Sequence, residues 1–369
     1  MILKGKMMNA RTLIIAEAGV NHNGDIEKAK ALIIAAKASG ADIVKFQTFK
    51  ASNLVTEAAE MADYQKQNIG NETSQYAMLK SLELTFEQFK ELQDFSMQMG
   101  IVFLSTAFDF ESLAFLHNDL NLPLFKIPSG ELTNAPFVLA HARLGKPLIV
   151  STGMAELDEI TRALSVIAYG YLFPEDDSPS LEKFESALDS EAGQQLLKER
   201  VTVLHCTTEY PTPLNDVNLK AMQTLAERFN VNVGYSDHTE GVLVPSTAVA
   251  LGAKIIEKHF TLDRSLPGPD HKASLEPDEL KTMVDNIRQV EQMLGSKEKK
   301  PAASELKNKQ VARKSIVASC DIDIGQIINE QDVAIMRPGE GLSPEHYWQV
   351  VGQVSQHKYK KGDYIKLAD

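Results

Sequence analysis

Cysteine is scarce in this sequence, which contains only Cys206 and Cys320 among its 369 residues. Two cysteines are too few for a disulfide framework and suit a reducing compartment. Apolar runs of membrane-spanning length are also missing, and the N-terminal stretch lacks the apolar run and cleavage site of a signal peptide. We therefore expect a cytoplasmic protein that does not enter membranes.

Positive charge is in short supply as well. The chain has 38 lysines and arginines against 50 aspartates and glutamates, which gives a formal net charge of −12. Nucleic acids and anionic membranes bind basic surfaces, so this balance argues against both as partners. If the substrate is an anion, the cationic side chains that bind it must be gathered locally.

Eight short apolar runs rich in β-branched residues alternate with segments of helical pattern. Such alternation over about 250 residues predicts a (β/α)₈ barrel. A doubly wound open sheet is the alternative, but neither a G-x-G-x-x-G motif nor a P-loop follows the first run, which disfavours it. The expected strands lie at residues 12–19, 42–49, 101–108, 124–130, 147–153, 201–206, 231–237 and 254–261.

The barrel pattern closes with a helical segment, so we assign residues 1–296 to a barrel domain. Residues 297–306 are polar and charged and read as a linker, and residues 307–369 form a small domain with short strands and many turns. Two excursions interrupt the barrel. We expect 50–84 to place extra helices over its mouth, and the acidic stretch 170–200 to be a solvated elaboration.

Polar side chains stand where each of the eight expected strands ends, in a framework that is otherwise apolar. Catalytic groups of (β/α)₈ enzymes lie at the carboxyl ends of the strands, so the pattern predicts an active site there. In strand order the residues are Glu17; Lys45 and Gln47; Ser105 and Thr106; Lys126, Ser129 and Glu131; Ser151 and Thr152; Cys206, Thr207 and Thr208; Ser236, Asp237 and His238; His259.

These residue types suggest a particular chemistry. Lys45 and Lys126, together with nearby hydroxyls, suit a phosphate or a carboxylate. Two imidazoles at successive strand ends, His238 and His259, suit a Mn²⁺-like ion completed by water and substrate better than a closed zinc site. Each has a plainer interpretation, since a lone histidine is usually a hydrogen-bonded core residue and a lysine can extend from the barrel rim. We expect Cys206 to be a packed thiol, not a nucleophile.

Nine motifs in order resemble those of bacterial sialic acid synthases, the N-acetylneuraminate synthases. They are IIAEAGVNHNGD, VKFQTF, LSTAFD, KIPSGEL, STGMA, HCTTEYPTP, YSDHTEG, EKHFTLD and PGPDH. The tail, with ARKSIVA and RPGEG, is similar to the antifreeze-like, or SAF, domain of that family. The resemblance runs from about residue 12 to residue 350.

That resemblance implies condensation of phosphoenolpyruvate with an open-chain N-acetylated amino sugar, which yields a nine-carbon 2-keto acid and phosphate. The implied metal ligands, for Mn²⁺ or alternatively Mg²⁺ or Co²⁺, are His238 and His259. Phosphoenolpyruvate would be held by Lys45, Thr106, Lys126, Ser129, Ser151 and Ser236. The acceptor sugar would be surrounded by Glu17, Gln47, Glu131, Tyr210 and Asp270. Glu17 is also the candidate for proton transfer, and Arg337 would reach the sugar from the SAF domain of the other subunit in a domain-swapped homodimer.

Some alternatives stay open at this point. The acceptor is N-acetylmannosamine in a sialic acid synthase and a 2,4-diacetamido-6-deoxyhexose in a legionaminic or pseudaminic acid synthase. Thr208 stands where some members carry Asn, and Val311 where many carry Phe. A Schiff-base pyruvate aldolase with Lys126 as nucleophile and a non-catalytic carbohydrate-binding protein are the rival classes.

Overall fold

The computed structural model describes residues 11–61, 65–66, 68 and 74–367. The chain divides into two compact units, one that ends at Gly295 and one over Ser296–Asp369. Each unit is described by itself.

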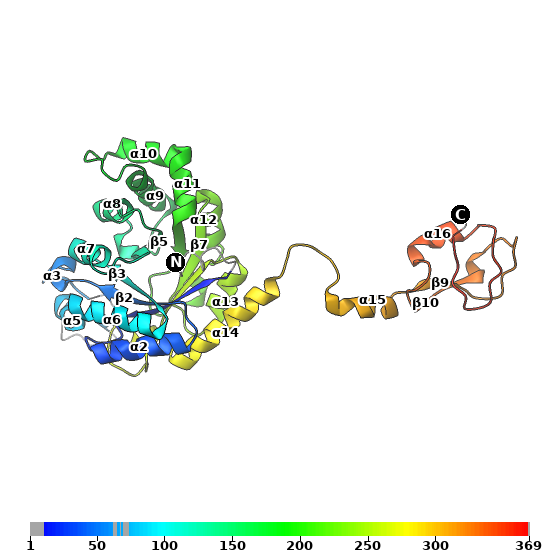
Figure 1. The fold of residues 1–369 in the computed structure, drawn as a ribbon, viewed down its shortest axis with the longest axis horizontal. Coiled ribbons are helices and arrows are strands. Elements are labelled where there is room, and N and C mark those ends of the chain that lie inside the picture. The colour runs from blue at the N-terminus through cyan, green and yellow to red at the C-terminus, as the bar shows by residue number, and fades with distance from the viewer. Residues whose placement is uncertain (1–10, 62–64, 67, 69–73, 368–369) are drawn as a thin grey trace. The chain divides into compact units, whose positions relative to one another are not determined.

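The first unit is built on eight parallel strands (Figure 1). Neighbouring strands follow the order β3-β2-β1-β8-β7-β6-β5-β4, and β3 and β4 at the two ends of this order also lie beside each other. The sheet therefore closes into a barrel, which confirms the predicted fold class. The strands are β1 (Leu13–Gly19), β2 (Ile43–Thr48), β3 (Val102–Ala107), β4 (Phe125–Ile127), β5 (Leu148–Ser151), β6 (Val201–His205), β7 (Asn232–Asp237) and β8 (Ile255–His259).

Helices pack around the outside of the strands (Figure 1). Their ends carry the expected signals. Asp25 caps the helix that begins at Ile26, Thr85 and Gln88 form a reciprocal capping box, and Gly100 ends that helix in the left-handed region. The main helices are α2 (Ile26–Ala38), α6 (Phe86–Met99), α7 (Phe110–Asn118), α8 (Ala135–Arg143), α9 (Leu157–Leu172), α12 (Ala221–Phe229), α13 (Leu243–Ala250) and α14 (Pro277–Leu294), with short 3₁₀ turns at Ser129–Glu131, Leu214–Asp216 and His271–Ala273.

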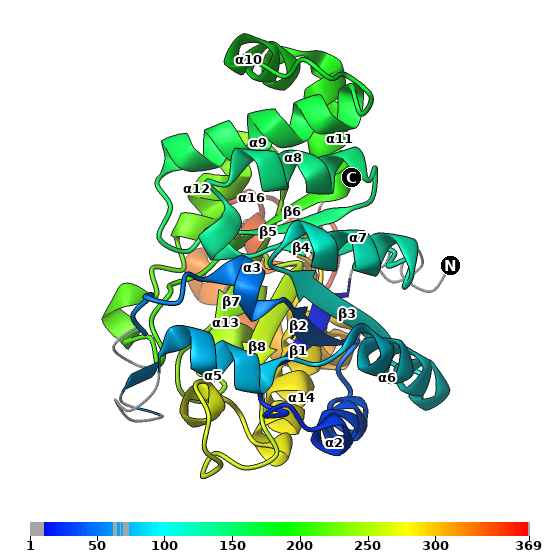
Figure 2. The same cartoon turned by 90° about the vertical axis from the view of Figure 1, so that its left-hand side faces the viewer.

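The two excursions take different positions. Residues 50–84 include α3 (Ala51–Leu54) and α5 (Gln75–Leu82), and α5 contributes to the wall of the main cavity. The acidic stretch forms α10 (Leu181–Asp189) and α11 (Glu191–Arg200), which pack on α9, and α10 lies outside it in Figure 2. The first excursion therefore shapes the cavity, and the second elaborates the outer surface.

The second unit has its own small hydrophobic core. An antiparallel pair, β9 (Ser315–Ala318) and β10 (Val333–Met336), is joined by isolated bridges to later segments. Its helices are α15 (Leu306–Ala312) and α16 (Tyr347–Val350), with 3₁₀ turns at Ala303–Glu305, Glu330–Asp332 and Pro344–His346. Across the described residues of both units, no helix has the length and hydropathy needed to cross a bilayer.

Candidate active site

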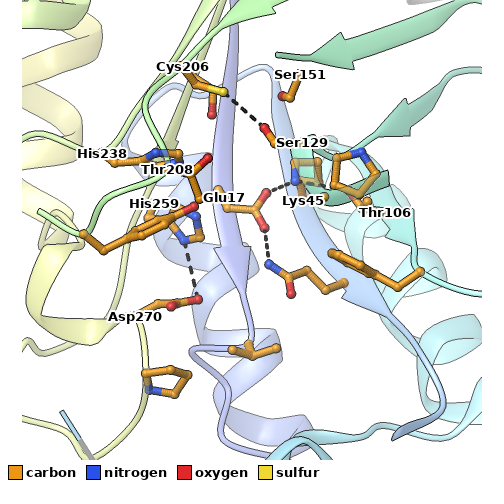
Figure 3. A pocket seen from close by; sticks show the side chains of 18 of the residues that line it. Glu17, Lys45, Thr106, Ser129, Ser151, Cys206, Thr208, His238, His259 and Asp270 are labelled. Carbon is orange, nitrogen blue, oxygen red and sulfur yellow. Dashed lines mark hydrogen bonds and ion pairs between the residues drawn. The ribbon is translucent and has the colours of Figure 1, made fainter. Parts of the chain in front are cut away.

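A cavity of about 400 Å³ opens at the carboxyl ends of the barrel strands (Figure 3). It brings together side chains from all eight strands or from the loops that follow them. Among the residues predicted for catalysis and binding, those that line it are Glu17, Lys45, Gln47, Thr106, Lys126, Ser129, Ser151, Tyr210, Ser236, His238, His259 and Asp270.

Strand register explains why these side chains meet. Glu17 on β1 pairs with Lys45 on β2 and, on its other side, with His259 on β8. Partners in a ladder project to the same face of a sheet, so the three side chains form one row that points into the barrel. Gln47 and Thr106 form a second such pair between β2 and β3.

Glu257 is a cavity residue that was missed in the sequence. It lies two positions before His259, and alternation in a strand places residues two apart on the same face. Its Oε1 atom accepts from Lys126 Nζ at 2.6 Å and from Ser236 Oγ at 2.8 Å. The period-two pattern around His259 was the signal that would have found it.

The two lysines and two glutamates form one buried ionic network. Lys45 contacts Glu17, lies 3.5 Å from Glu257 Oε2, and donates to Thr106 Oγ1 at 3.2 Å. The side chains of Glu17, Lys45 and Glu257 are at most 4% exposed. The cations expected for an anionic substrate are thus present, and in this state carboxylates balance them.

Burial and neighbouring charges shift the pKa values of the two glutamates in opposite directions. Burial raises the pKa of Glu17 above its ordinary value, and the negative charge of Glu257 adds to this, although Lys45 acts in the opposite direction. Burial also acts to raise the pKa of Glu257, but Lys126 and Lys45 outweigh it, and the result is a lowered pKa. Groups with diverging pKa values in one site are a common arrangement for acid and base chemistry, and Glu17 is the one suited to carry a proton.

Hydroxyl groups without partners line the β4–β6 side of the cavity. Ser151 Oγ and Thr208 Oγ1 are buried and have no hydrogen-bond partner among the described residues. Ser129 lies beside them, with its Oγ 3.3 Å from Cys206 Sγ, and accepts from the Gly153 N–H at 3.0 Å. Free hydroxyls in a buried wall are suited to bind an anion's oxygens, because a buried donor gains by being satisfied.

Gly153 makes this wall possible. A Cβ atom at this position would lie 2.3 Å from Thr208 Oγ1 and 2.8 Å from Ser129 Oγ. Cys206 is buried as expected, and burial raises the pKa of its thiol. Its neighbour His205 faces the other way and bonds to the Val217 carbonyl oxygen, so the two do not form a nucleophile–base pair.

The two predicted metal ligands lie together, with ring centroids 5.7 Å apart. His238 Nδ1 lies 2.6 Å from the Thr207 carbonyl oxygen, which can only accept, so the proton is on Nδ1 and Nε2 carries a lone pair. His259 Nδ1 is buried without a hydrogen-bond partner. Burial lowers the pKa of His238 to about 4, and burial together with His238 lowers that of His259 well below its usual value.

Neutral imidazoles are the form that binds a metal ion. Across the residues that the structure describes, no group of three or more His, Cys, Asp and Glu side chains gathers as a metal site. The pair therefore fits an open coordination sphere completed by water or substrate, and does not form a closed structural site.

Asp270 enters the cavity from the loop that follows β8. Its Oδ2 atom lies 4.0 Å from His259 Nδ1 (Figure 3), and burial, with Glu17 nearby, raises its pKa to about 7. Tyr210 packs on the His238 ring with a centroid separation of 4.2 Å, and Gln47 donates to Glu17 Oε1 at 3.4 Å.

The cavity also has a hydrocarbon wall, which we call the apolar wall. It is formed by Val20, Met78, Leu79, Leu82 and Phe108.

Glu131, which was predicted to contact the sugar, does not line this cavity. It accepts from Asn134 Nδ2 at 2.7 Å and lines an adjacent hollow between α3, α7 and α8. Arg337 is exposed in the second unit, where Ser315 holds its loop by donating to the Pro338 carbonyl oxygen. Their roles stay predictions. Val311 is also exposed, on α15.

Comparison with protein families follows the same division of the chain. The model of the NeuB family matches residues 32–299, and that of the SAF domain matches residues 313–369. The chain belongs to the NeuB family.

Similar proteins align with almost the entire length of this chain. It is 47% identical to an N,N'-diacetyllegionaminic acid synthase of Campylobacter jejuni over 96% of this chain and 99% of that protein. It is 46% identical to an enzyme of the same name from Legionella pneumophila, over 95% of this chain and 92% of that one. Among solved structures, an N-acetylneuraminic acid synthetase of Leptospira borgpetersenii in complex with citrate matches with a TM-score of 0.64 and 32% identity, over 81% of this chain and 90% of that one.

Proposed function

We propose that the protein condenses phosphoenolpyruvate, an open-chain acetamido sugar and water into a nine-carbon 2-keto acid and phosphate. The observation that carries this proposal is the cavity itself, where two buried lysines and free hydroxyls adjoin a neutral imidazole pair in a chain of the NeuB family. A substrate with both a phosphate and a carboxylate matches the first group, and a sugar aldehyde matches the second.

Phosphoenolpyruvate would bind by replacing carboxylates as the partners of the lysines. Lys45 and Lys126 are balanced by Glu17 and Glu257 in the structure. Protonation of Glu17, which its raised pKa favours, leaves the lysines with excess positive charge for the incoming anion. The unpartnered hydroxyls of Ser151 and Thr208 would add neutral donors.

His238 and His259 would hold a divalent ion, Mn²⁺ first and Mg²⁺ or Co²⁺ as alternatives. Such an ion supplies Lewis acidity toward a carbonyl oxygen. Glu17 lies between the imidazoles and Lys45 in Figure 3, so an aldehyde bound beside the imidazoles would face the phosphoenolpyruvate subsite across Glu17.

In the reaction, C3 of phosphoenolpyruvate forms a bond to the aldehyde carbon, and water adds at C2. The resulting tetrahedral centre expels phosphate by cleavage of the C–O bond. Glu17 lies between the lysines and the histidines and would handle the protons of the water and the new hydroxyl.

We further propose a 2,4-diacetamido-6-deoxyhexose as the acceptor, with N-acetylmannosamine as the alternative. The names of the two relatives support this choice, and so does the apolar wall. A second acetamido methyl and a 6-methyl group add hydrocarbon surface that the apolar wall can cover, whereas a 6-hydroxyl would be left without a partner there.

Two assays test these statements. Purified enzyme with Mn²⁺ and phosphoenolpyruvate should release phosphate with the diacetamido acceptor and turn over N-acetylmannosamine at least about tenfold less efficiently. Phosphoenolpyruvate labelled at its bridging oxygen should transfer the label to phosphate. Label in the ketone product would refute C–O cleavage, and trapping of pyruvate on Lys126 by borohydride would instead indicate a Schiff-base aldolase.

Arg337 would complete the acceptor subsite from the SAF domain of a second subunit in a domain-swapped homodimer. Guanidinium offers a fixed fork of donors to a carbonyl group, and Arg337 is exposed on its own unit. Subunits with Arg337→Ala mixed with subunits carrying Glu17→Gln should regain activity, because one sound barrel then receives one sound arginine. Failure to recover after verified exchange would mean that each chain serves its own cavity.

A further inference from the structure

Two loops on one side of the cavity hold each other through polar side chains that are buried, except for the half-buried Asn23. The first, residues 20–25, follows β1, and the second, residues 260–275, follows β8 and carries Asp270. The side chains that join them lie more than 200 residues apart in the chain. We call this set the β1–β8 clasp; it consists of Asn21, Asn23, Thr261, His271 and Ser274.

The Asn23 half of the clasp has a fixed direction. Asn23 Nδ2 donates to the Pro267 carbonyl oxygen at 2.8 Å, which orients the amide and turns its oxygen toward His271. His271 Nε2 must then carry a proton, because it lies 3.1 Å from Asn23 Oδ1. The other ring nitrogen is left to accept from Thr261 Oγ1 at 2.7 Å. Both His271 nitrogens are therefore satisfied in a ring with 0% exposure.

The Asn21 half leads to Asp270 itself. Asn21 Nδ2 donates to the Phe260 carbonyl oxygen at 2.8 Å and lies 3.0 Å from Ser274 Oγ. That hydroxyl donates in turn to the backbone oxygen of Asp270 at 2.6 Å. The bonds thus connect the end of β1 with the backbone position from which the Asp270 carboxyl group enters the cavity.

Glycines let the clasp close and bring it against helix α5, which carries part of the apolar wall. A Cβ atom on Gly268 would lie 2.6 Å from the His271 ring and 2.9 Å from Asn23 Oδ1. A Cβ atom on Gly24 would lie 2.6 Å from the Ser81 backbone oxygen on α5, the helix that carries part of the apolar wall. The 20–25 loop therefore contacts both the 260–275 loop and α5.

We propose that Asn21, Asn23 and His271 are positioning residues, which hold the 260–275 loop so that the Asp270 carboxyl group faces His259. None of the three lines the cavity, so they act through Asp270 and not on substrate. The kinetic consequences rest on the proposed function, whereas the effect on the loop does not.

Asn23→Asp is the sharpest test. Aspartate retains the acceptor for His271 and is tolerated at the positive φ of 53° found here, but it loses the donor to Pro267. We expect the KM of the acceptor to rise about tenfold with the KM of phosphoenolpyruvate changed less than about twofold. Amide hydrogen exchange over residues 271–275 should accelerate by about tenfold.

Histidine variants and a matched control complete the design. His271→Gln can keep the donor to Asn23 and should recover part of what His271→Ala loses. Asn218 has the same residue type at a φ of 46°, also donates from its amide to a backbone oxygen, and lies outside the cavity. Asn218→Asp should change neither the acceptor KM nor exchange over 271–275.

Three outcomes decide the proposal. Unchanged exchange and unchanged acceptor KM in Asn23→Asp would overturn it. Faster exchange could also come with an equal rise of both KM values, or with no rise in either. Both results would show that the clasp has only a general structural role, and both would overturn the proposal. Should the wild-type enzyme form no product with either acceptor, the proposed function fails, and the exchange data alone then determine whether the clasp holds the loop.

Discussion

Strand β8 carries a buried ion pair on each of its two faces, and the two pairs differ in how completely they are satisfied. On the outer face Lys258 Nζ lies 2.6 Å from Asp237 Oδ2 and also donates to the Thr239 carbonyl oxygen. Asp237 in turn accepts from the Thr239 N–H and hydroxyl at 3.1 Å. Both side chains have 0% exposure.

On the inner face Glu257 pairs with Lys126 and Lys45, but this network borders a cavity of about 400 Å³ with free hydroxyls. In the outer pair the ammonium group and both carboxylate oxygens have partners within the protein. The inner network, in contrast, borders open space and free hydroxyls. The same residue types thus complete their own pairing on one face and, on the other, border the cavity in which we propose that an anion binds.

The largest effect should come from the imidazoles on the inner side. Chelation is expected to abolish activity, and Mn²⁺ should restore it in the wild type but not in His238→Ala or His259→Ala. Loss of a Lewis acid is worth several kcal/mol, so roughly 10³-fold or more in kcat/KM is expected. Mn²⁺ binding to the apo-protein, followed by electron paramagnetic resonance, should weaken in parallel.

His205 provides the control for this experiment, because it lies on the outer side of β6 and bonds to the Val217 carbonyl oxygen. His205→Gln should leave Mn²⁺ binding unchanged. Full turnover by His259→Ala in excess chelator would contradict a metal role for the pair.

The outer pair should affect stability more than chemistry. Lys258→Met leaves the Asp237 carboxylate buried without its cation, which typically costs about 3–5 kcal/mol of unfolding free energy. Asp237→Asn combined with Lys258→Met should recover most of that loss, because no unpaired charge remains. Urea denaturation measures both.

Lys126→Met makes the same side-chain change on the inner face, and there we expect the KM of phosphoenolpyruvate to rise about tenfold or more. If Lys258→Met and Lys126→Met altered stability and KM alike, the contrast between the faces would be wrong.

The smallest effect concerns Asp270 and pH. Its pKa of about 7 in the folded protein exceeds its ordinary value, so the folded state binds the proton more tightly than the unfolded chain. The resulting stabilisation is complete at acidic pH and is lost as pH rises through 7. In the presence of a chelator, wild type should therefore lose stability relative to Asp270→Asn between pH 4 and pH 8, by at least about 1 kcal/mol. A constant difference across that range would show that the carboxyl group is not desolvated.

The sequence was most informative about residues whose position follows from strand alternation. Each of the eight expected strands forms, and polar residues from the end of every strand meet because parallel strands of a barrel end on one side, although Asp237 projects to the outer face. Glu257 was predictable by the same alternation from His259 and was missed. Its neighbour Lys258 was not recognised as the partner of Asp237, although the two are aligned in adjacent strands.

Other features depend on contacts that no local pattern encodes. The hydrogen bond from Asn21 to Ser274 joins residues 253 positions apart, and it forms only when the barrel closes β1 against β8. Glu131 follows a strand by a few residues, yet a 3₁₀ turn at Ser129–Glu131 carries it to a neighbouring hollow. The spacing of residues along the chain predicts where the strand ends, but it does not predict the direction in which the 3₁₀ turn carries Glu131.

The opposite charges on the two faces of β8 also bear on how reliably the chain folds. A slip of one residue in the pairing of β8 would turn Lys258 into the barrel and drive Glu257 and His259 among the surrounding helices. Each of these groups would then be buried away from its partner, so the wrong alignment carries a penalty at several positions at once. The correct register of β8 is therefore strongly favoured over a one-residue shift. Single-residue insertions or deletions within 255–259 should be among the least tolerated changes in the protein.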